Sequence, residues 1–249
     1  MHGGSIVHLP LHGALAPLTQ SSKVPSSLVS GLMAYWKLEE ASGSRADVLG
    51  VATLTDNNSV TSTTGKIGDA AVTTNTRFLS RAGTAFQFAG VDFTISAWAN
   101  PTTLVGANAL GRCVCRCSNG DATGDWILGV TADGGVSGYH WKSAGTDATG
   151  RHITTTTALV SLTTWTHVVF RRSSGTYTIW TNGVSRVFTD ATSSSGFGNV
   201  GYQMGRMAAG AGFAWEGALD ETGIWNRGIT DAEVASLYNA GAGNQYPFS

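Results

Sequence analysis

Short strands joined by tight turns are the feature of this sequence that most restricts its fold. The segment TWTHVVFRRSSGTYTIWTNGVSRVF, residues 164–188, predicts three strands. A Ser-Ser-Gly turn separates the first two strands, and Asn182-Gly183 separates the second from the third. Asn-Gly is the strongest short hairpin signal because both residues tolerate a positive φ. These hairpins predict an antiparallel sheet.

Further strands precede this segment. VDFTISAWANP, residues 91–101, alternates apolar and polar side chains, and DWILGVTADGGVSGYHW, residues 125–141, is predicted to be a strand, an Asp-Gly-Gly turn and a strand. Charged residues make up only 12% of the chain, against the usual ~25%. Long solvated helices need charged outer faces, so the composition also favours strands and turns. The prediction is an all-β antiparallel sandwich.

One short helix is expected near the C-terminus, in TDAEVASLYNAG, residues 230–241. Thr230 is a natural N-cap, and Glu233 three residues later completes a capping box. Apolar residues then recur at i, i+3 and i+4, which is the spacing of one helix face. Gly241 is predicted to end the helix in a left-handed cap.

Residues 1–30 differ in character from the rest of the chain. They hold three of the six histidines and three of the five prolines. Val7, Leu9 and Leu11 alternate with other residues, as in an extended segment. We expect an N-terminal arm that docks on its own domain or on a neighbouring subunit as an added strand, followed by a sandwich over residues 31–249. Prolines break the apolar part of the arm, and no basic residue precedes Lys23, so a secretion signal is not predicted.

The three cysteines all lie in RCVCRCS, at Cys113, Cys115 and Cys117. At this spacing they would share one face of a strand. One interpretation is half of a zinc site, but the spacing is shorter than the usual ~2–4 intervening residues and no second pair exists. The sequence favours free thiols packed on a strand.

Charge and hydropathy exclude two classes of partner. The net charge is −1, the isoelectric point is about 6.6, and no run of Lys or Arg exceeds two residues. A nucleic-acid-binding protein normally presents a basic face, so we expect no nucleic acid. No apolar stretch reaches the ~18 residues that predict a membrane span, so we expect no membrane partner.

Five segments in order carry a resemblance to a known family. They are AYWKLEEASGSRADVLGVATLTD, TGKIGDAA, FTISAWANP, the three-strand segment above, and AWEGALDETGIWNRGITDAEVASLYNAG. Over about residues 32–248 they resemble a laminin G-like domain of the concanavalin A-like lectin/glucanase superfamily. The resemblance implies a jelly roll of two curved antiparallel sheets, here with one short C-terminal helix and an extended N-terminal arm.

The details SRADVLG and LTDNN resemble a subgroup found in bacteriophage virion proteins. This resemblance implies a virion structural protein, a capsid decoration or tail-surface protein, located on the virion surface. Its partners would be other virion proteins held through the arm, with a homo-oligomer, for which we expect a trimer, and a surface polysaccharide. The alternative is a free, extracellular or cell-surface lectin module that binds carbohydrate.

A glycoside hydrolase is the third alternative, because such enzymes share this superfold. They need two carboxyl groups ~5 Å apart on one strand. Glu216, Asp220 and Glu221 do not keep the expected alternation, and Glu39-Glu40 are adjacent and so point to opposite faces. We therefore predict no catalytic residues and no enzyme.

Calcium is the only cofactor that the resemblance suggests. In related domains an aspartate at the position of Asp220, with one from the loop after the first strand, here Asp47, holds a structural ion. Calcium takes ~6–8 oxygen ligands, so carbonyls and waters would have to contribute. The alternative is that Asp47 makes a turn and Asp220 hydrogen-bonds the backbone.

A glycan platform is predicted where aromatic residues flank turns. Trp126, Tyr139 and Trp141 could stack on a sugar ring, and Asn119 and Asp125 could add hydrogen bonds. The same residues could instead form a protein interface.

Overall fold

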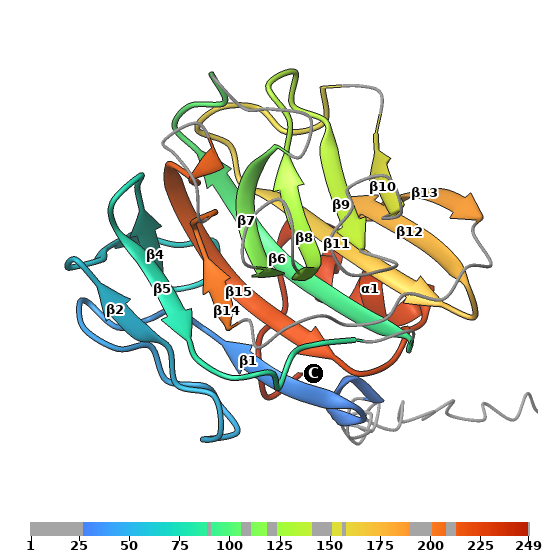
Figure 1. Cartoon of the computed structure of the whole chain (residues 1–249), viewed down its shortest axis with the longest axis horizontal. Coiled ribbons are helices and arrows are strands. Elements are labelled where there is room, and N and C mark those ends of the chain that lie inside the picture. The colour runs from blue at the N-terminus through green and yellow to red at the C-terminus, as the bar shows by residue number, and fades with distance from the viewer. Residues whose placement is uncertain are drawn as a thin grey trace, which may run out of the picture.

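Two antiparallel sheets and one short helix make up the folded body (Figure 1). The computed structural model describes residues 27–88, 91–105, 111–118, 124–140, 151–155, 158–189, 201–207 and 213–248. The predicted all-β sandwich with one C-terminal helix is confirmed. In the described ranges no helix is long and apolar enough to cross a membrane.

The larger sheet has eight strands, in the order β13-β12-β11-β6-β15-β4-β3, with β1 also paired to β15. Strand β15 comes from the end of the chain and yet lies at the middle of the sheet, between β6 on one side and β4 and β1 on the other. The bounds are β1 (Leu32–Trp36), β3 (Thr61–Thr64), β4 (Asp69–Thr73), β6 (Phe93–Pro101), β11 (Thr166–Ser173), β12 (Thr176–Thr181), β13 (Val184–Thr189) and β15 (Gly217–Trp225).

The smaller sheet has seven strands, in the order β10-β9-β8-β7-β14-β5-β2. Its central strands β7, β8 and β9 follow one another in sequence, as expected for a meander. The bounds are β2 (Thr55–Asn57), β5 (Phe78–Arg81), β7 (Arg112–Ser118), β8 (Gly124–Val130), β9 (Val136–His140), β10 (Arg151–Thr154) and β14 (Tyr202–Met204).

The two tight turns occur at the residues where the sequence predicts them. Asn182 and Gly183 have φ values of 49° and 78°, so both adopt the left-handed conformation that the two-residue turn between β12 and β13 requires. The turn between β11 and β12 likewise has positive φ at Ser174, 48°, and Gly175, 78°. All six residues of β12 pair in register with β13.

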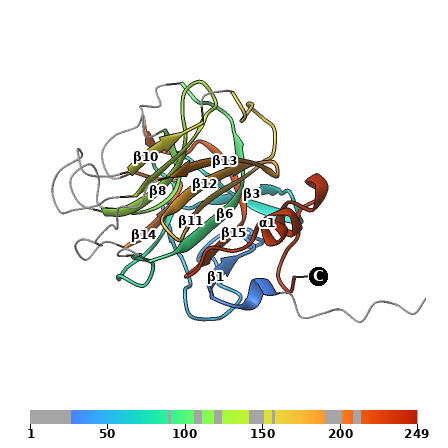
Figure 2. The same ribbon diagram turned by 90° about the vertical axis from the view of Figure 1, so that its right-hand side faces the viewer.

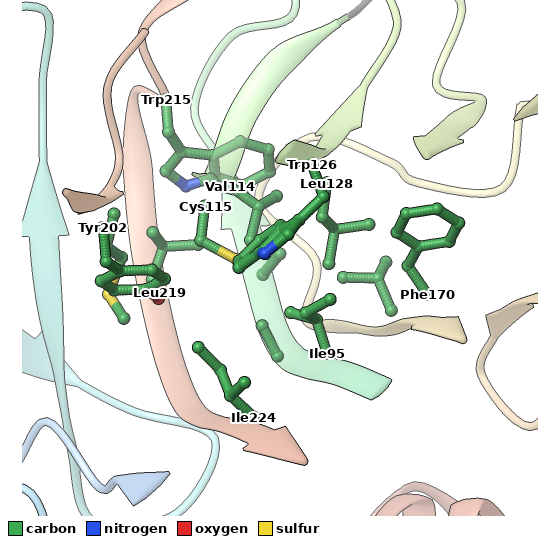
Figure 3. Close-up of a cluster of buried hydrophobic side chains, with 14 of the residues drawn as sticks. Ile95, Val114, Cys115, Trp126, Leu128, Phe170, Tyr202, Trp215, Leu219 and Ile224 are labelled. Carbon is green, nitrogen blue, oxygen red and sulfur yellow. The ribbon is translucent and has the colours of Figure 1, made fainter. Parts of the chain in front are cut away.

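The core lies between the two sheets, and large aromatic rings fill it (Figure 3). The rings of Trp36 and Tyr202 stack with centroids 5.0 Å apart, and Trp126 and Trp215 are fully buried beside them. Burying a large ring removes ~150–250 Å² of surface from water, so these residues dominate the packing energy. Figure 3 shows side chains from both sheets converging on this cluster, with Leu219 and Ile224 from β15 and Val114, Cys115 and Leu128 from the smaller sheet.

Helix α1 (Asp231–Tyr238) begins as predicted. The hydroxyl of Thr230 accepts the backbone N–H of Glu233, and the Glu233 carboxylate accepts the N–H of Thr230, which completes the capping box. The end differs from the prediction, because Asn239, with φ 47°, takes the left-handed cap position in place of Gly241. Asn tolerates this conformation, so the helix ends two residues early, in the 3-10 turn η4 (Asn239–Gly241).

Helix α1 and the C-terminal segment cover the outer face of the larger sheet (Figure 2). The last residues of the predicted arm belong to this layer, because the 3-10 turn η1 (Ser27–Val29) buries Leu28, and Trp225 Nε1 donates to the Leu28 carbonyl at 2.7 Å. Residues 1–26 lie outside the described residues. The covering cluster is formed by Leu28, Tyr35, Val169, Trp180, Trp225, Ile229, Val234, Leu237 and Phe248.

The prediction that the three cysteines share one face is wrong. The register of β7 against β8 shifts between Cys113 and Cys115. As a result, Cys115 and Cys117 belong to the main core, while Cys113 packs in a separate cluster with Ile127. All three are buried free thiols, as the sequence favoured.

Candidate functional site

The two adjacent acids of β15 sit at an irregularity in the strand. The pairing of β15 with β6 shifts between Asp220 and Gly223, and Glu221 has a φ of 45°. A bulge of this kind re-aims side chains and is common next to functional sites. The two carboxyl groups therefore take up different surroundings.

Asp220 is fully buried and holds the turn between β3 and β4. Its Oδ2 accepts the backbone N–H groups of Lys66, at 2.7 Å, and Ile67, at 3.0 Å, while Oδ1 accepts that of Glu221 at 2.9 Å. A Cβ at Gly65 would lie 2.7 Å from Oδ2, so this turn needs glycine there. Burial raises the pKa of Asp220 to about 7, although the three backbone donors oppose the shift.

Glu221 is held by a tyrosine. The hydroxyl of Tyr35 donates to Glu221 Oε2 at 2.5 Å and lies 3.2 Å from the carbonyl of Asn244. Among the described residues Glu221 Oε1 has no hydrogen-bond partner. Burial, followed by the nearby charge of Asp220, raises the pKa of Glu221 to about 8.

The two acids of the predicted calcium site both accept backbone N–H groups, and calcium binding there stays a prediction. Asp47 accepts the backbone N–H of Tyr35 at Oδ1, 2.9 Å, and that of Val51 at Oδ2, 3.0 Å. Every carboxylate oxygen of Asp47 and Asp220 thus already accepts a backbone donor. The described ranges contain no group of three or more His, Cys, Asp or Glu side chains that could hold a metal ion. The turn and backbone roles considered as the alternative are the ones observed.

The glycosidase alternative finds no support in the geometry of these acids. Asp220 and Glu221 are 0% and 2% exposed, so they lie in the interior, and Glu216 pairs with Arg112 Nη1 at 3.3 Å. A general acid and a nucleophile must both reach the scissile bond of a substrate. The buried acids of β15 instead accept hydrogen bonds from other segments of the chain.

A serine–histidine pair lies elsewhere on the larger sheet and is closed to solvent. Ser96 Oγ and His167 Nε2 are 2.8 Å apart, but the residues are only 2% and 1% exposed. Burial lowers the pKa of His167 to about 3, so the ring is neutral at physiological pH. His167 is therefore a buried residue of the larger sheet and not an exposed base.

The predicted glycan platform needs correction at two positions. Trp126 is fully buried in the core, and its Nε1 donates to the Phe86 carbonyl at 2.8 Å. Tyr139 is 4% exposed and packs with Ile127 and Met207 on the other face of the smaller sheet. Neither ring is available for stacking on a sugar.

Asn119 and Trp141 lie outside the described residues, as does the side chain of Asp125. Register pairs Trp126 with His140, so the start of β8 and the end of β9 lie at the same end of the sheet. The platform therefore remains a prediction for that end.

The opposite end of the sandwich carries a hollow of about 600 Å³, which we call the loop-end hollow. Ligand sites typically have ~300–1,000 Å³. Three segments form it: residues 104–105 after β6, the turn between β8 and β9, and residues 160–162 before β11. Its lining is Leu104, Val105, Ala132, Asp133, Gly134, Val160, Ser161 and Leu162.

Backbone hydrogen bonds hold the loop-end hollow in shape. The carbonyl of Gly134 accepts the N–H groups of Leu159 and Val160, each at 3.0 Å, and Thr163 N donates to the Pro101 carbonyl at 2.8 Å. Val105 and Leu162 are nevertheless 80% and 49% exposed. Sequence reasoning missed this site because its three segments are far apart, and exposed aliphatic residues in loops were its only local signal.

A second hollow, of about 280 Å³, has a lining that includes Lys37, Glu39 and Glu40. Two of these carboxylates are already engaged, because Glu39 accepts Asp69 N at 2.7 Å and Glu40 accepts Ala46 N at 2.6 Å. The loop-end hollow is larger and is the better candidate for ligand binding.

Solved structures with the same fold include several binding domains. The binding domain of Paraclostridial Mosquitocidal Protein 1 matches with a TM-score of 0.66 and 16% identity, over 84% of this chain and 52% of that one. The chain thus spans about half of that domain. The botulinum neurotoxin serotype G binding domain matches with a TM-score of 0.61 and 14% identity, over 83% and 50%.

Domain 4 of AbnA, an extracellular arabinanase from Geobacillus stearothermophilus solved with arabinotriose, matches over 86% of this chain and 98% of its own. Its TM-score is 0.59 and its identity 17%. No curated protein matches the sequence. The family model of the concanavalin A-like lectin/glucanases superfamily, Laminin_G_3, matches residues 65–235. The chain therefore belongs to this superfamily and has its lectin-like fold.

Proposed function

We propose that the chain is a non-enzymatic virion structural protein, a capsid decoration or tail-surface protein, whose lectin-like domain adheres to surface glycans through the loop-end hollow. The observation that carries the glycan-binding part is this hollow itself, about 600 Å³ in volume and open at exposed Val105 and Leu162. Loops at the end of a rigid sandwich are common places for binding sites.

The chemistry of the hollow suits a sugar. Leu104 and Val160, both nearly buried, offer an apolar floor for the C–H face of a ring. Asp133 stands at the turn with Oδ1 accepting the Thr131 hydroxyl at 2.5 Å and the Gly135 N–H at 3.1 Å. These hydrogen bonds lower the pKa of Asp133 and keep it an acceptor for sugar hydroxyls.

The comparisons support a binding role. The matching AbnA domain was solved with arabinotriose, and the two matching toxin domains are binding domains. Display on a virion rests on the resemblance of SRADVLG and LTDNN to phage virion domains and on the different character of the first residues. In this proposal the arm joins the protein to other virion proteins and to copies of itself, with a trimer expected.

A glycan-array screen of the full chain tests the binding part. We expect Val105→Asp to abolish the signal, because it places a charge over the apolar floor. The matched control is Val51→Asp, since Val51 is 64% exposed at another place on the surface. Equal binding by the wild type and Val105→Asp would exclude the loop-end hollow. Loss with Trp141→Ala instead would place the site at the opposite end.

Light scattering tests the assembly part. The full chain is compared with a chain beginning at Ser27, the first residue of the packed turn η1. Circular dichroism first verifies that the shorter chain is folded. An oligomeric full chain and a monomeric short chain support the assembly role. Two monomers that still bind glycan would favour the alternative, a free or cell-surface lectin module.

A further inference from the structure

In the part of the chain that the structure describes, strand β13 is the last strand of the larger sheet, and its outer edge is unpaired. All six of its residues pair with β12, and no strand in the described part of the chain pairs with its other side (Figure 1). Every second residue of such an edge points an N–H and a C=O outward, so the edge is a template for another strand.

Among the described residues, a single charge is the only usual protection of this edge against pairing. Val184 and Val187 are 58% and 63% exposed, and Arg186 is the only charged residue of the strand. Native sheets usually protect an edge with charges, proline, a bulge or a very short strand. The outermost strand at the other end of this sheet, β3, has only four residues, all Ser or Thr. Unprotected valines on β13 suggest that another segment covers them.

Val187 marks the face on which that segment would lie. Phe188 packs against the main core, so its neighbour Val187 points to the opposite face. Val187 is in register with Thr178, and Trp180, two residues further along β12, belongs to the cluster under α1. An apolar stripe on this face would therefore continue the layer that the helix already forms.

The N-terminal arm has a matching pattern in SIVHLPL, residues 5–11. Val7, Leu9 and Leu11 alternate and can form one apolar stripe. In an antiparallel pair, every second residue of the edge strand uses its backbone N–H and C=O to hydrogen-bond the neighbouring strand. The residues between them point these groups away from that strand. If Val7 and Leu9 bond to β13, then Pro10, which has no N–H, faces away. Proline at that position would also block any further strand.

The arm begins close enough to reach the edge. Ser27 Oγ donates to Glu233, near the start of α1, at 2.6 Å. At the other end of this helix Tyr238 lies beside Gly183, which directly precedes β13. The helix has eight residues and is ~12 Å long, while the residues between 11 and 27 can span ~50 Å when extended.

We propose that residues 5–11 of the arm add to the free edge of β13 as the outermost strand of the larger sheet, with Val7 and Leu9 on the side of Val187. This deepens the proposed function, because the arm's docking surface becomes a specific strand. Docking onto a neighbouring copy would link subunits, whereas docking onto the same copy would close the sheet of a single molecule.

Disulfide trapping in the full chain tests the docking. The double variant Leu9→Cys/Val187→Cys is compared with Leu9→Cys/Val51→Cys, whose second site is equally exposed but lies on a loop. The three native thiols are buried in both. We expect rapid oxidation of the Val187 pair, at least tenfold faster than the Val51 pair. Equal rates would overturn the proposal.

Hydrogen exchange gives a second readout without new cysteines. Leu9→Asp puts a charge into the apolar stripe, and His8→Asp puts the same charge on the other face of the arm. We expect Leu9→Asp to speed exchange of the β13 amides at least tenfold and His8→Asp to leave them near the wild-type rate. Unchanged β13 exchange in Leu9→Asp would contradict the docking.

The mass of the trapped species separates this inference from the proposed function. A crosslink between chains supports both the docking and the assembly role. A crosslink within a monomeric chain supports the docking and excludes assembly through the arm. Pairing of two β13 strands would give crosslinks between Val187→Cys chains that do not need Leu9→Cys, and it would overturn the proposal.

Discussion

Asp220 and Glu221 are neighbours on one strand and are both buried, yet their hydrogen-bond partners differ. Asp220 receives three backbone N–H donors, while Glu221 receives one tyrosine hydroxyl and leaves Oε1 without a partner among the described residues. A third acid, Glu233 at the start of α1, accepts hydrogen bonds from Arg227. The comparison teaches that the partner, more than burial alone, decides whether a carboxylate stabilises this fold.

The largest expected effect is the loss of Asp220. Asp220→Ala would leave the N–H groups of Lys66, Ile67 and Glu221 without their acceptor. Each unsatisfied buried donor costs ~1–3 kcal/mol, and part of this is recovered by water at the turn, so we expect about 3 kcal/mol of destabilisation. Urea unfolding measures it. A loss below about 1 kcal/mol would show that the turn does not depend on this carboxylate.

The next largest expected effect is the loss of Arg227, the cationic partner of Glu233. Arg227 donates to both Glu233 oxygens, at 2.9 and 2.6 Å, and to the carbonyls of Ser27 and Ser30. Breaking a buried pair by removing one partner costs ~3–5 kcal/mol, but Arg227 is about a quarter exposed, so we expect about 2 kcal/mol for Arg227→Ala. Arg227→Lys is the control and should lose about half as much, because it keeps the charge without the fork of donors.

Arg227→Ala should also change how the free energy of unfolding depends on pH below 4.5, which we call the acid limb. Hydrogen bonds from Arg227 lower the pKa of Glu233 from 4.5 to about 2. A lowered folded-state pKa contributes stability that is present above pH 4.5 and is lost as the pH falls towards 2. Arg227→Ala should flatten this part of the profile. An unchanged acid limb would mean that another carboxylate carries it.

The pH dependence of stability that Glu221 causes should have the opposite sign to that of Glu233. Its folded-state pKa of about 8 lies above the ordinary 4.5, so the folded protein keeps the proton longer and loses stability as the pH rises from 4.5 to 8. Glu221→Gln mimics the neutral form and should be more stable than the wild type at pH 9, by about 1–2 kcal/mol, and nearly equal at pH 5. Thermal unfolding at both pH values measures it. A variant less stable at pH 9 would contradict the raised pKa.

The sequence predicted those parts of the fold that depend on local residues. The Asn182-Gly183 turn and the capping box of α1 follow from residues adjacent in the chain, and both were confirmed. The burial of Trp126 was not predictable, because alternation separates two faces without telling which one meets the other sheet. The loop-end hollow was also missed, since three segments distant in sequence form it.

The smallest expected effect comes from Thr230, which contacts Glu233 at the start of the helix, and it is compared with the effect of Arg227. Thr230→Ala removes the hydroxyl that accepts the Glu233 N–H at 3.2 Å but leaves the Arg227 pair intact. Loss of an N-cap typically costs ~1 kcal/mol, so we expect about that at neutral pH. Since Arg227 is the main cause of the lowered pKa of Glu233, the acid limb should persist in this variant. A chemical-denaturation series from pH 2 to 7 on Thr230→Ala and Arg227→Ala then distinguishes a backbone cap from a charge partner. Loss of the acid limb in Thr230→Ala would mean that the helix start, and not the guanidinium, holds the carboxylate in place.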